Sequence, residues 1–199
     1  MKRLTRYALA VAAWMTIVST AAANESYKID PAHSTISFKV NQFLAATTGK
    51  FRKFSGTIEI DREQPEKSSV VAKIDARSVD TRNRKRDDHL RSADFFNVAK
   101  YPEITFKSRS VKQTGKQNGD IMGDLTMHGV TRPVALHVEL MSPVASETKR
   151  TRWTVTTNPL KRRDFGLMFG RSAEAIFGIS QSVALNIEIE AVRGELSGL

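Results

Sequence analysis

The sequence predicts an all-β protein: an antiparallel barrel of about eight strands with one short helical crossing segment. Two observations carry this prediction. Apolar and polar residues alternate with a period of two in one segment after another, which is typical of strands with one buried face. Short turn-like connections separate these segments, as in antiparallel sheets. A two-sheet sandwich fits the same pattern, but closure into a barrel removes exposed sheet edges.

The first strands are expected in the amino-terminal half, where inward apolar residues are separated by polar ones. Near the start, Ser37 and Lys39 separate the apolar residues of one such segment. The predicted inward positions of these strands are Ile36, Phe38 and Val40, then Ile58 and Ile60, then Val70, Ala72 and Ile74, and then Ile104 and Phe106.

Residues 80–98 interrupt this pattern and predict a helix. Asp80 or Thr81 is the expected N-cap, because a side-chain oxygen there can accept a free backbone N–H. The adjacent acids Asp87 and Asp88 are expected on a solvated face of the helix, within a mixed run of charges. Two pairs have the four-residue spacing of helical ion pairs, namely Arg84 with Asp88 and Asp87 with Arg91.

The second half continues with four more alternating segments. Pro102 is expected to end the helical region and start a strand at Glu103. His128 and Gly129 predict a tight hairpin turn, since glycine accepts a positive φ. The inward positions predicted here are Ile121, Leu125 and Met127, then Val134, Leu136, Val138 and Leu140, then Trp153, Val155 and Thr157, and then Val183, Leu185, Ile187 and Ile189.

The first 23 residues have the pattern of a cleavable secretory signal peptide. A basic start is followed by an apolar run over residues 7–18 and by small residues at 21–23. That run is shorter than the roughly 20 residues of a membrane-spanning helix. We therefore expect cleavage after Ala23, a periplasmic location, and one domain over residues 24–199. The chain has no cysteine, so no disulfide supports the fold.

The chain is basic, with a formal net charge of +10. Such a charge favours anionic partners, and the predicted export counts against nucleic acid. Peripheral contact with anionic membranes is therefore expected. The oligomeric state stays open at this point, with a homodimer among the options.

The sequence carries no recognisable catalytic or metal-binding motif. It lacks the nucleophile elbow of serine hydrolases and the glycine patterns of nucleotide-binding loops. The four histidines, His33, His89, His128 and His137, are not spaced as paired metal ligands. We therefore predict no metal, no cofactor and no enzymatic activity.

Several separated stretches form a distinctive set. The most specific one covers residues 90–134, where LRSADFFNVAKYPEITFKS is followed by GDLTMHGVTRPV. The others are YKIDPAHSTISFKV at the first strand, GKFRKFSGTIEI at residues 49–60 and the Asp164-Phe165-Gly166 triplet. Together they resemble the YceI-like family, which comprises secreted lipocalin-like barrels of which some bind polyisoprenoid lipids.

The resemblance implies a carrier that sequesters a polyisoprenoid or related long-chain amphiphile inside the barrel. Two alternatives stay open: an enzyme acting on an isoprenoid or other apolar substrate, and a structural or stress protein with a filled core. For the head group of the ligand, the nearest candidates are Arg86, His89 and Arg91. The candidate contacts of the tail are Phe38, Val40, Phe51, Phe106, Leu125, Val155, Phe165, Phe169 and Phe177.

Overall fold

The computed structural model describes residues 25–43, 45–142, 149–169, 174, 176 and 178–194. The expected signal peptide, residues 1–23, and the candidate tail contact Phe177 lie outside the described residues. Within the described part, no helix is long and apolar enough to cross a membrane.

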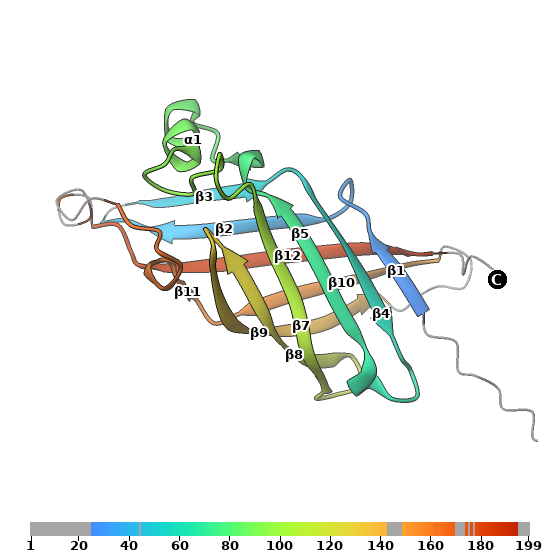
Figure 1. Ribbon diagram of the computed structural model, residues 1–199. Coiled ribbons are helices and arrows are strands. Elements are labelled where there is room, and N and C mark those ends of the chain that lie inside the picture. Colours follow the sequence, from blue (N-terminus) through green and yellow to red (C-terminus); the bar gives the residue numbers. More distant parts are fainter. Residues whose placement is uncertain are drawn as a thin grey trace, which may run out of the picture.

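Strands dominate the described residues (Figure 1). One α-helix, α1 (Arg84–Arg91), and three short 3₁₀ helices, η1 (Pro65–Lys67), η2 (Ala76–Ser78) and η3 (Arg162–Phe165), accompany them. The strands are β1 (Glu25–Ile29), β2 (Thr35–Asn41), β3 (Ala46–Phe51), β4 (Phe54–Ile60), β5 (Ser69–Asp75), β6 (Val79–Asp80), β7 (Glu103–Gln113), β8 (Asn118–Met127), β9 (Val130–Ser142), β10 (Arg150–Thr157), β11 (Leu160–Lys161) and β12 (Ser182–Arg193).

These strands merge into a closed antiparallel barrel of eight strands. β1 and β2 pair one after the other along the same edge of β12, so together they form one interrupted barrel strand. β3 with β4, β5 with β6, and β10 with β11 are interrupted in the same way. The pairing of β1 with both β4 and β12 closes the ring. The predicted barrel is confirmed, and the sandwich alternative is wrong.

Successive connections of such a barrel alternate between its two ends. The β2–β3 hairpin, the α1 crossing, the β8–β9 turn and the η3 segment before β12 therefore share one end, which we call the lidded end (Figure 1). The β4–β5 connection with η1 and the β7–β8 turn lie at the opposite end, the open mouth. The stretch of strongest family resemblance, residues 90–134, thus supplies two of the four connections at the lidded end.

The predicted β8–β9 turn is present between Met127 and Val130. Its two residues, His128 and Gly129, have φ angles of 52° and 74°, the paired left-handed conformation of a tight hairpin. A Cβ atom on Gly129 would lie 2.6 Å from Cε1 of Tyr101, so glycine is also required by close approach. β7 begins at Glu103, directly after Pro102, as expected.

Three expectations for the helix are wrong. The N-cap is Asn83, whose side chain accepts the N–H of Arg86, rather than Asp80 or Thr81. Asp87 is buried and accepts hydrogen bonds from the backbone N–H and the hydroxyl of Thr81, at 2.9 and 2.6 Å. It therefore does not lie on a solvated face and does not pair with Arg91.

Arg91 has other partners. Its guanidinium donates to the carbonyl oxygens of Arg77 and Val79, at 2.8 and 2.7 Å, and lies 3.1 Å from a carboxylate oxygen of Asp88. The predicted pair of Arg84 and Asp88 is present at 3.9 Å. The helix is thus attached to the barrel through carbonyls that the sequence pattern does not reveal.

Candidate functional site: the barrel interior

The inward side chains of the barrel enclose two adjoining cavities. The lower chamber, of about 200 Å³, lies in the body of the barrel and is lined by aliphatic and aromatic residues together with Ser55. The upper chamber, of about 120 Å³, lies under the connections of the lidded end. Four residues line both cavities and form the waist between them: Phe51, Met127, Leu160 and Leu185.

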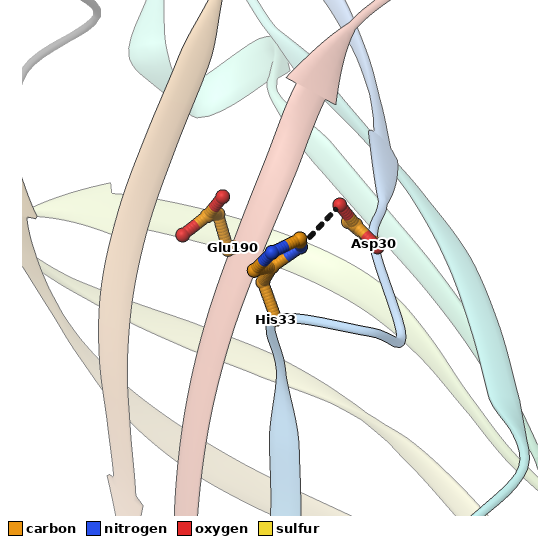
Figure 2. A group of neighbouring side chains, drawn as sticks. All are labelled: Asp30, His33 and Glu190. Atoms are coloured by element: carbon orange, nitrogen blue, oxygen red, sulfur yellow. Dashed lines mark hydrogen bonds and ion pairs between the residues drawn. The ribbon is translucent and has the colours of Figure 1, made fainter.

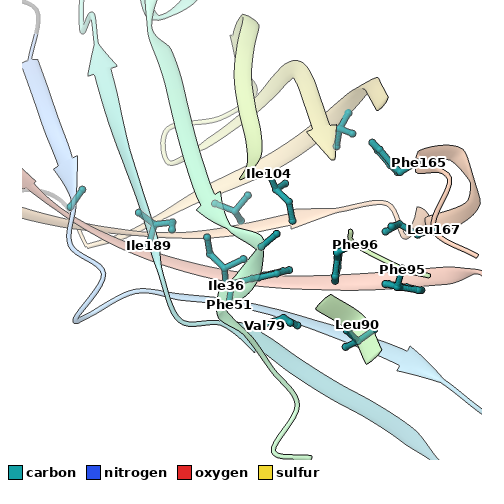
Figure 3. Close-up of a cluster of buried hydrophobic side chains, with 14 of the residues drawn as sticks. Ile36, Phe51, Val79, Leu90, Phe95, Phe96, Ile104, Phe165, Leu167 and Ile189 are labelled. Atoms are coloured by element: carbon teal, nitrogen blue, oxygen red, sulfur yellow. The ribbon is translucent and has the colours of Figure 1, made fainter. Parts of the chain in front are cut away.

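Most residues that line the lower chamber are ones that the period-two pattern predicts to point inward. Each inward segment contributes, from Ile36 on β2 to Ile189 on β12. Figure 3 labels these two residues within the cluster of buried apolar side chains. Polar residues between them, such as Lys39 and Lys73, point outward and are exposed. An apolar cavity of this size stays free of ordered water and can take apolar ligands.

Two inward phenylalanines lie flat against glycines and so leave the interior open. Phe38 covers Gly49 on the neighbouring strand, where an added Cβ would lie 2.3 Å from Cζ of the ring. Phe106 covers Gly123 on β8, where the corresponding distance is 2.4 Å. A side chain at either glycine would push the ring into the cavity.

Aromatic side chains close the lidded end. Phe95 and Phe96, which follow α1, pack edge to face with ring centroids 5.1 Å apart, and Phe96 contacts Phe51 at the waist. Phe95 also packs on Phe169, four residues after the end of η3, with ring centroids 4.8 Å apart. Phe95 and Phe96 are labelled in Figure 3. The lid therefore consists of two segments, far apart in sequence, that meet through their rings.

Two arginines introduce positive charge into the upper chamber. Arg86 lines it and donates to the hydroxyl and the carbonyl of Thr81, at 2.8 and 3.0 Å. Arg162 is only 2% exposed; its Nη1 lies 2.6 Å from Glu174, and its guanidinium stacks over Phe169. Among the described residues, Nη2 of Arg162 has no hydrogen-bond partner.

Glu174 compensates the buried charge of Arg162. Hydrogen bonds from Arg162, first, and from Arg163 stabilise the carboxylate, and they lower the pKa of Glu174 to about 2 against the desolvation that opposes them. Two guanidinium groups thus share one carboxylate. Together with Arg86, they leave the lidded end with an excess of positive charge.

Most of the candidate ligand contacts do line the cavities. Six are apolar residues of strands, and Arg86 and Phe169 belong to the lid. The lower chamber contains Phe106, Leu125 and Val155, the upper chamber contains Phe38, Val40, Phe169 and Arg86, and the waist contains Phe51.

Three candidates lie elsewhere. Phe165 is buried behind the chamber wall and lines neither cavity. His89 is exposed and stacks on the ring of Phe169, 5.8 Å between centroids. Arg91 is held by the carbonyls described above. Sequence reasoning missed Arg162, because a basic residue in the run 161–163 predicts exposure.

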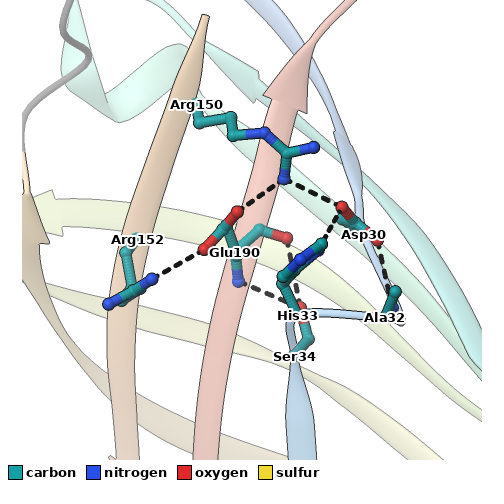
Figure 4. Close-up of polar contacts among 7 residues, drawn as sticks. All are labelled: Asp30, Ala32, His33, Ser34, Arg150, Arg152 and Glu190. Carbon is teal, nitrogen blue, oxygen red and sulfur yellow. Dashed lines mark hydrogen bonds and ion pairs between the residues drawn. The ribbon is translucent and has the colours of Figure 1, made fainter. Parts of the chain in front are cut away.

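A group of three ionisable side chains on β12 and the β1–β2 connection has the proximity of metal ligands (Figure 2). Nδ1 of His33 lies 2.8 Å from Asp30, and Nη1 of Arg150 lies 2.9 Å from Asp30 and 2.5 Å from Glu190 (Figure 4). Arg152 pairs with the second oxygen of Glu190 at 2.8 Å. Guanidinium groups therefore already occupy the positions that a cation would take.

This network has a structural role. Ser34 accepts the N–H of Glu190 and donates to its carbonyl, at 2.9 and 3.1 Å, which fixes the interruption between β1 and β2 onto β12 (Figure 4). Hydrogen bonds from His33, first, and Arg150 lower the pKa of Asp30 to about 2. The network lies outside the two chambers.

A closed antiparallel barrel around an apolar interior cavity defines the class of lipocalin-like barrel proteins. Within that class, the chain belongs to the YceI-like family, whose domain model matches residues 27–191. A Vibrio cholerae relative designated a UPF0312 protein is 36% identical over 194 residues, covering 95% of this chain and 98% of the relative.

Solved structures have the same fold. BcnA of Burkholderia cenocepacia superimposes with a TM-score of 0.75 at 24% identity, over 82% of this chain and 99% of BcnA. A domain from Saccharophagus degradans, described as a polyisoprenoid binding domain implicated in plant cell wall breakdown, gives a TM-score of 0.64 at 21% identity. That match covers 84% of this chain and 98% of the domain.

Proposed function

We propose that this protein is an exported, periplasmic carrier of a polyisoprenoid or related long-chain amphiphile, and that it binds rather than transforms its ligand. The observation that carries the proposal is the pair of adjoining apolar chambers inside the barrel. Membership of the YceI-like family and the polyisoprenoid-binding description of the Saccharophagus domain support it.

The chambers supply the physical basis for binding an apolar tail. Each CH₂ group removed from water contributes about 0.8 kcal/mol, so a few isoprenoid units provide ample affinity. Ordering and immobilisation of the tail offset much of this gain. Ile104 and Leu125 offer contacts without directional preference, so the lower chamber suits a tail rather than a polar group.

The polar end of the ligand fits the upper chamber. Arg86 lines it from the lid, and Nη2 of Arg162 is directed at no acceptor among the described residues. Gln42 and Thr47 add uncharged polar groups on the side of the β2–β3 hairpin. This arrangement orients an amphiphile with its head under the lid and its tail in the barrel body.

The residues that line the chambers also argue against the two alternative functions, a structural or stress protein with a filled core and an enzyme acting on an apolar substrate. Side chains do not fill the interior, as a protein with a packed core requires. An enzyme needs titratable groups that converge on a reacting atom. Among the described residues that line the chambers, the charged ones are Arg86 and Arg162, and a guanidinium group offers hydrogen-bond donors but no acceptor.

Native mass spectrometry of the protein purified from an exporting cell tests the proposal. We expect a bound prenyl or acyl lipid at one molecule per protein. Added isoprenoids should also change the fluorescence of Trp153, which lines the lower chamber, and the change should be absent from Trp153→Phe. Ligand-free protein that gives no response to any added isoprenoid would contradict the carrier function.

Two neighbouring residues of β5 provide matched variants. Ala72 lines the lower chamber, and Val71 beside it is exposed on the outer face of the barrel. Ala72→Phe fills the chamber and should weaken binding of a long-chain isoprenoid at least about tenfold, the effect of losing roughly two buried CH₂ groups. Val71→Phe should leave the affinity unchanged. Equal affinities of the two variants would place the ligand outside the chamber.

A further inference from the structure

Among the described residues, large exposed apolar side chains lie either in connections of the lidded end or on strands of the barrel wall. Three belong to connections of the lidded end: Phe43 is 72% exposed, Met168 58% and Ile176 69%. Three others are distributed over strands of the barrel wall, namely Val71, Met122 and Met141. Exposed apolar side chains on loops at one end of a protein require a reason, because they lower solubility.

The apolar residues of the lidded end come from segments that contact each other. The ring of Phe43 covers Gly178, where an added Cβ would lie 2.5 Å from Cγ of the ring. The N–H of Ser180 donates to the carbonyl of Asn41 at 2.9 Å, which joins the β2–β3 hairpin to the segment that carries Ile176. The β2–β3 hairpin, which carries Phe43, thus contacts the chain at residues 178–180, just after Ile176.

Basic residues accompany these tips at the same end. α1 and the turn before it carry Arg82, Arg84 and Lys85, all exposed, and Arg84 has only a distant partner in Asp88 at 3.9 Å. Within the described residues, neither Arg82 nor Lys85 forms an ion pair. Most acids of this end are engaged: Asp80 pairs with Arg52, Asp87 is buried on Thr81, Asp88 contacts Arg84 and Arg91, and Glu174 holds Arg162 and Arg163. Asp94 and Asp164 are exposed and form no ion pair within the described residues, so the basic residues outnumber the free acids.

We infer that the lidded end is a docking surface for an anionic lipid bilayer. Apolar tips insert at the level of the head groups, while the neighbouring cations are attracted to anionic lipids; interfacial protein segments combine the same two features. The docking surface comprises Phe43, Met168 and Ile176 together with Arg82, Arg84 and Lys85.

The docking surface adjoins the upper chamber. Met168 stands between Leu167 and Phe169, which both line that chamber. Arg86, which also lines it, lies one residue from Lys85. This consequence rests on the proposed function: a membrane-bound amphiphile would pass between bilayer and chamber at this end without crossing water. Docking itself does not depend on the cargo.

Vesicle sedimentation of the full mature protein tests the inference. Vesicles of phosphatidylcholine with and without phosphatidylglycerol, both free of isoprenoids, are compared at low and high salt. We expect binding to the anionic vesicles at low salt and release at high salt, since screening weakens surface attraction. Failure to bind anionic vesicles at low salt would overturn the inference.

Triple variants locate the surface. The apolar variant F43S/M168S/I176S and the charge variant R82Q/R84Q/K85Q should each weaken vesicle binding at least about tenfold. The matched control V71S/M122S/M141S removes as many exposed apolar side chains from the barrel wall and should bind as the wild type does. Circular dichroism verifies the fold of all three. Equal loss in the control and the apolar variant would overturn the inference.

The readouts separate docking from ligand binding. Uptake of a soluble short-chain isoprenol, followed by Trp153 fluorescence, is measured without vesicles. A protein that takes up the isoprenol but fails to bind vesicles would contradict docking alone. A protein that binds vesicles but takes up no isoprenoid would contradict the carrier function alone.

Discussion

The upper and lower chambers of the barrel are bounded by different physical means. Strand pairing closes the lower chamber, whose walls come from alternate residues of neighbouring strands. Side-chain contacts close the upper chamber: rings that meet at Phe169, and a buried ion pair between Arg162 and Glu174. The walls of the cavity are therefore set by backbone pairing, whereas closure of the lidded end depends on a few side chains that substitution can replace.

Of the substitutions that test this difference between the chambers, Glu174→Gln should cause the largest loss of folding stability. The substitution leaves the buried guanidinium of Arg162 without its carboxylate, and breaking such a pair costs about 3–5 kcal/mol. Urea unfolding measures the loss. Glu188→Gln, on the exposed outer face of β12, is the control and should change stability little. Equal losses would mean that the lid does not depend on the ion pair.

Phe51→Leu changes the waist that separates the chambers. The ring of Phe51 borders both cavities and contacts Phe38 and Phe96, so its loss should cost about 1–2 kcal/mol and join the two spaces. Thermal unfolding gives the cost, and Trp153 fluorescence gives the affinity. Affinity for long tails should rise relative to that for short ones. An unchanged length preference would show that the waist does not restrict the tail.

Acid should weaken the ion pair between Glu174 and Arg162 that closes the lid. The pKa of Glu174 is about 2 in the folded protein and that of an ordinary glutamate is 4.5, so its stabilisation is complete above pH 4.5 and is lost as the pH falls towards 2. Asp30 acts in the same direction from an ordinary value of 3.8. Urea midpoints between pH 6 and pH 3 should fall less in Glu174→Gln than in the wild type, and Asp30→Asn should show a smaller difference. A steeper fall in Glu174→Gln would contradict the assignment.

The walls of the barrel were predictable from sequence and the lid was not. Period-two alternation placed Phe38, Val155 and Ile189 inward, because each side chain of a strand points to one of two faces. Period-two alternation holds only within strands, so it predicts nothing about the residues of the lid, which lie in helices and connections. The burial of Asp87 and Arg162 depends on partners that are local in space but are set by tertiary packing, and charge alone predicts exposure for both.

Residues that favour turns and helix ends predicted some boundaries of strands and helices correctly and others wrongly. Gly129 and Pro102 located a hairpin and a strand start correctly, since their backbone preferences act locally. The N-cap was misplaced by two residues or more, because Asp80, Thr81 and Asn83 all carry suitable oxygens. Tertiary contacts decide which of them is free to cap the helix: Asp80 accepts from Arg52 and from the N–H of Arg82, and Thr81 donates to Asp87.

The interruptions between β1 and β2, β3 and β4, and β5 and β6 lie on three adjacent barrel strands. Two of them are directly linked, because the N–H of Arg52 donates to the carbonyl of Ser78 and that of Asp75 to the carbonyl of Lys53. Regular ladder pairing lapses along this line, whereas β8 and β9 pair without a break over their shared length. At these interruptions, individual backbone hydrogen bonds therefore take the place of the regular ladder in joining neighbouring strands.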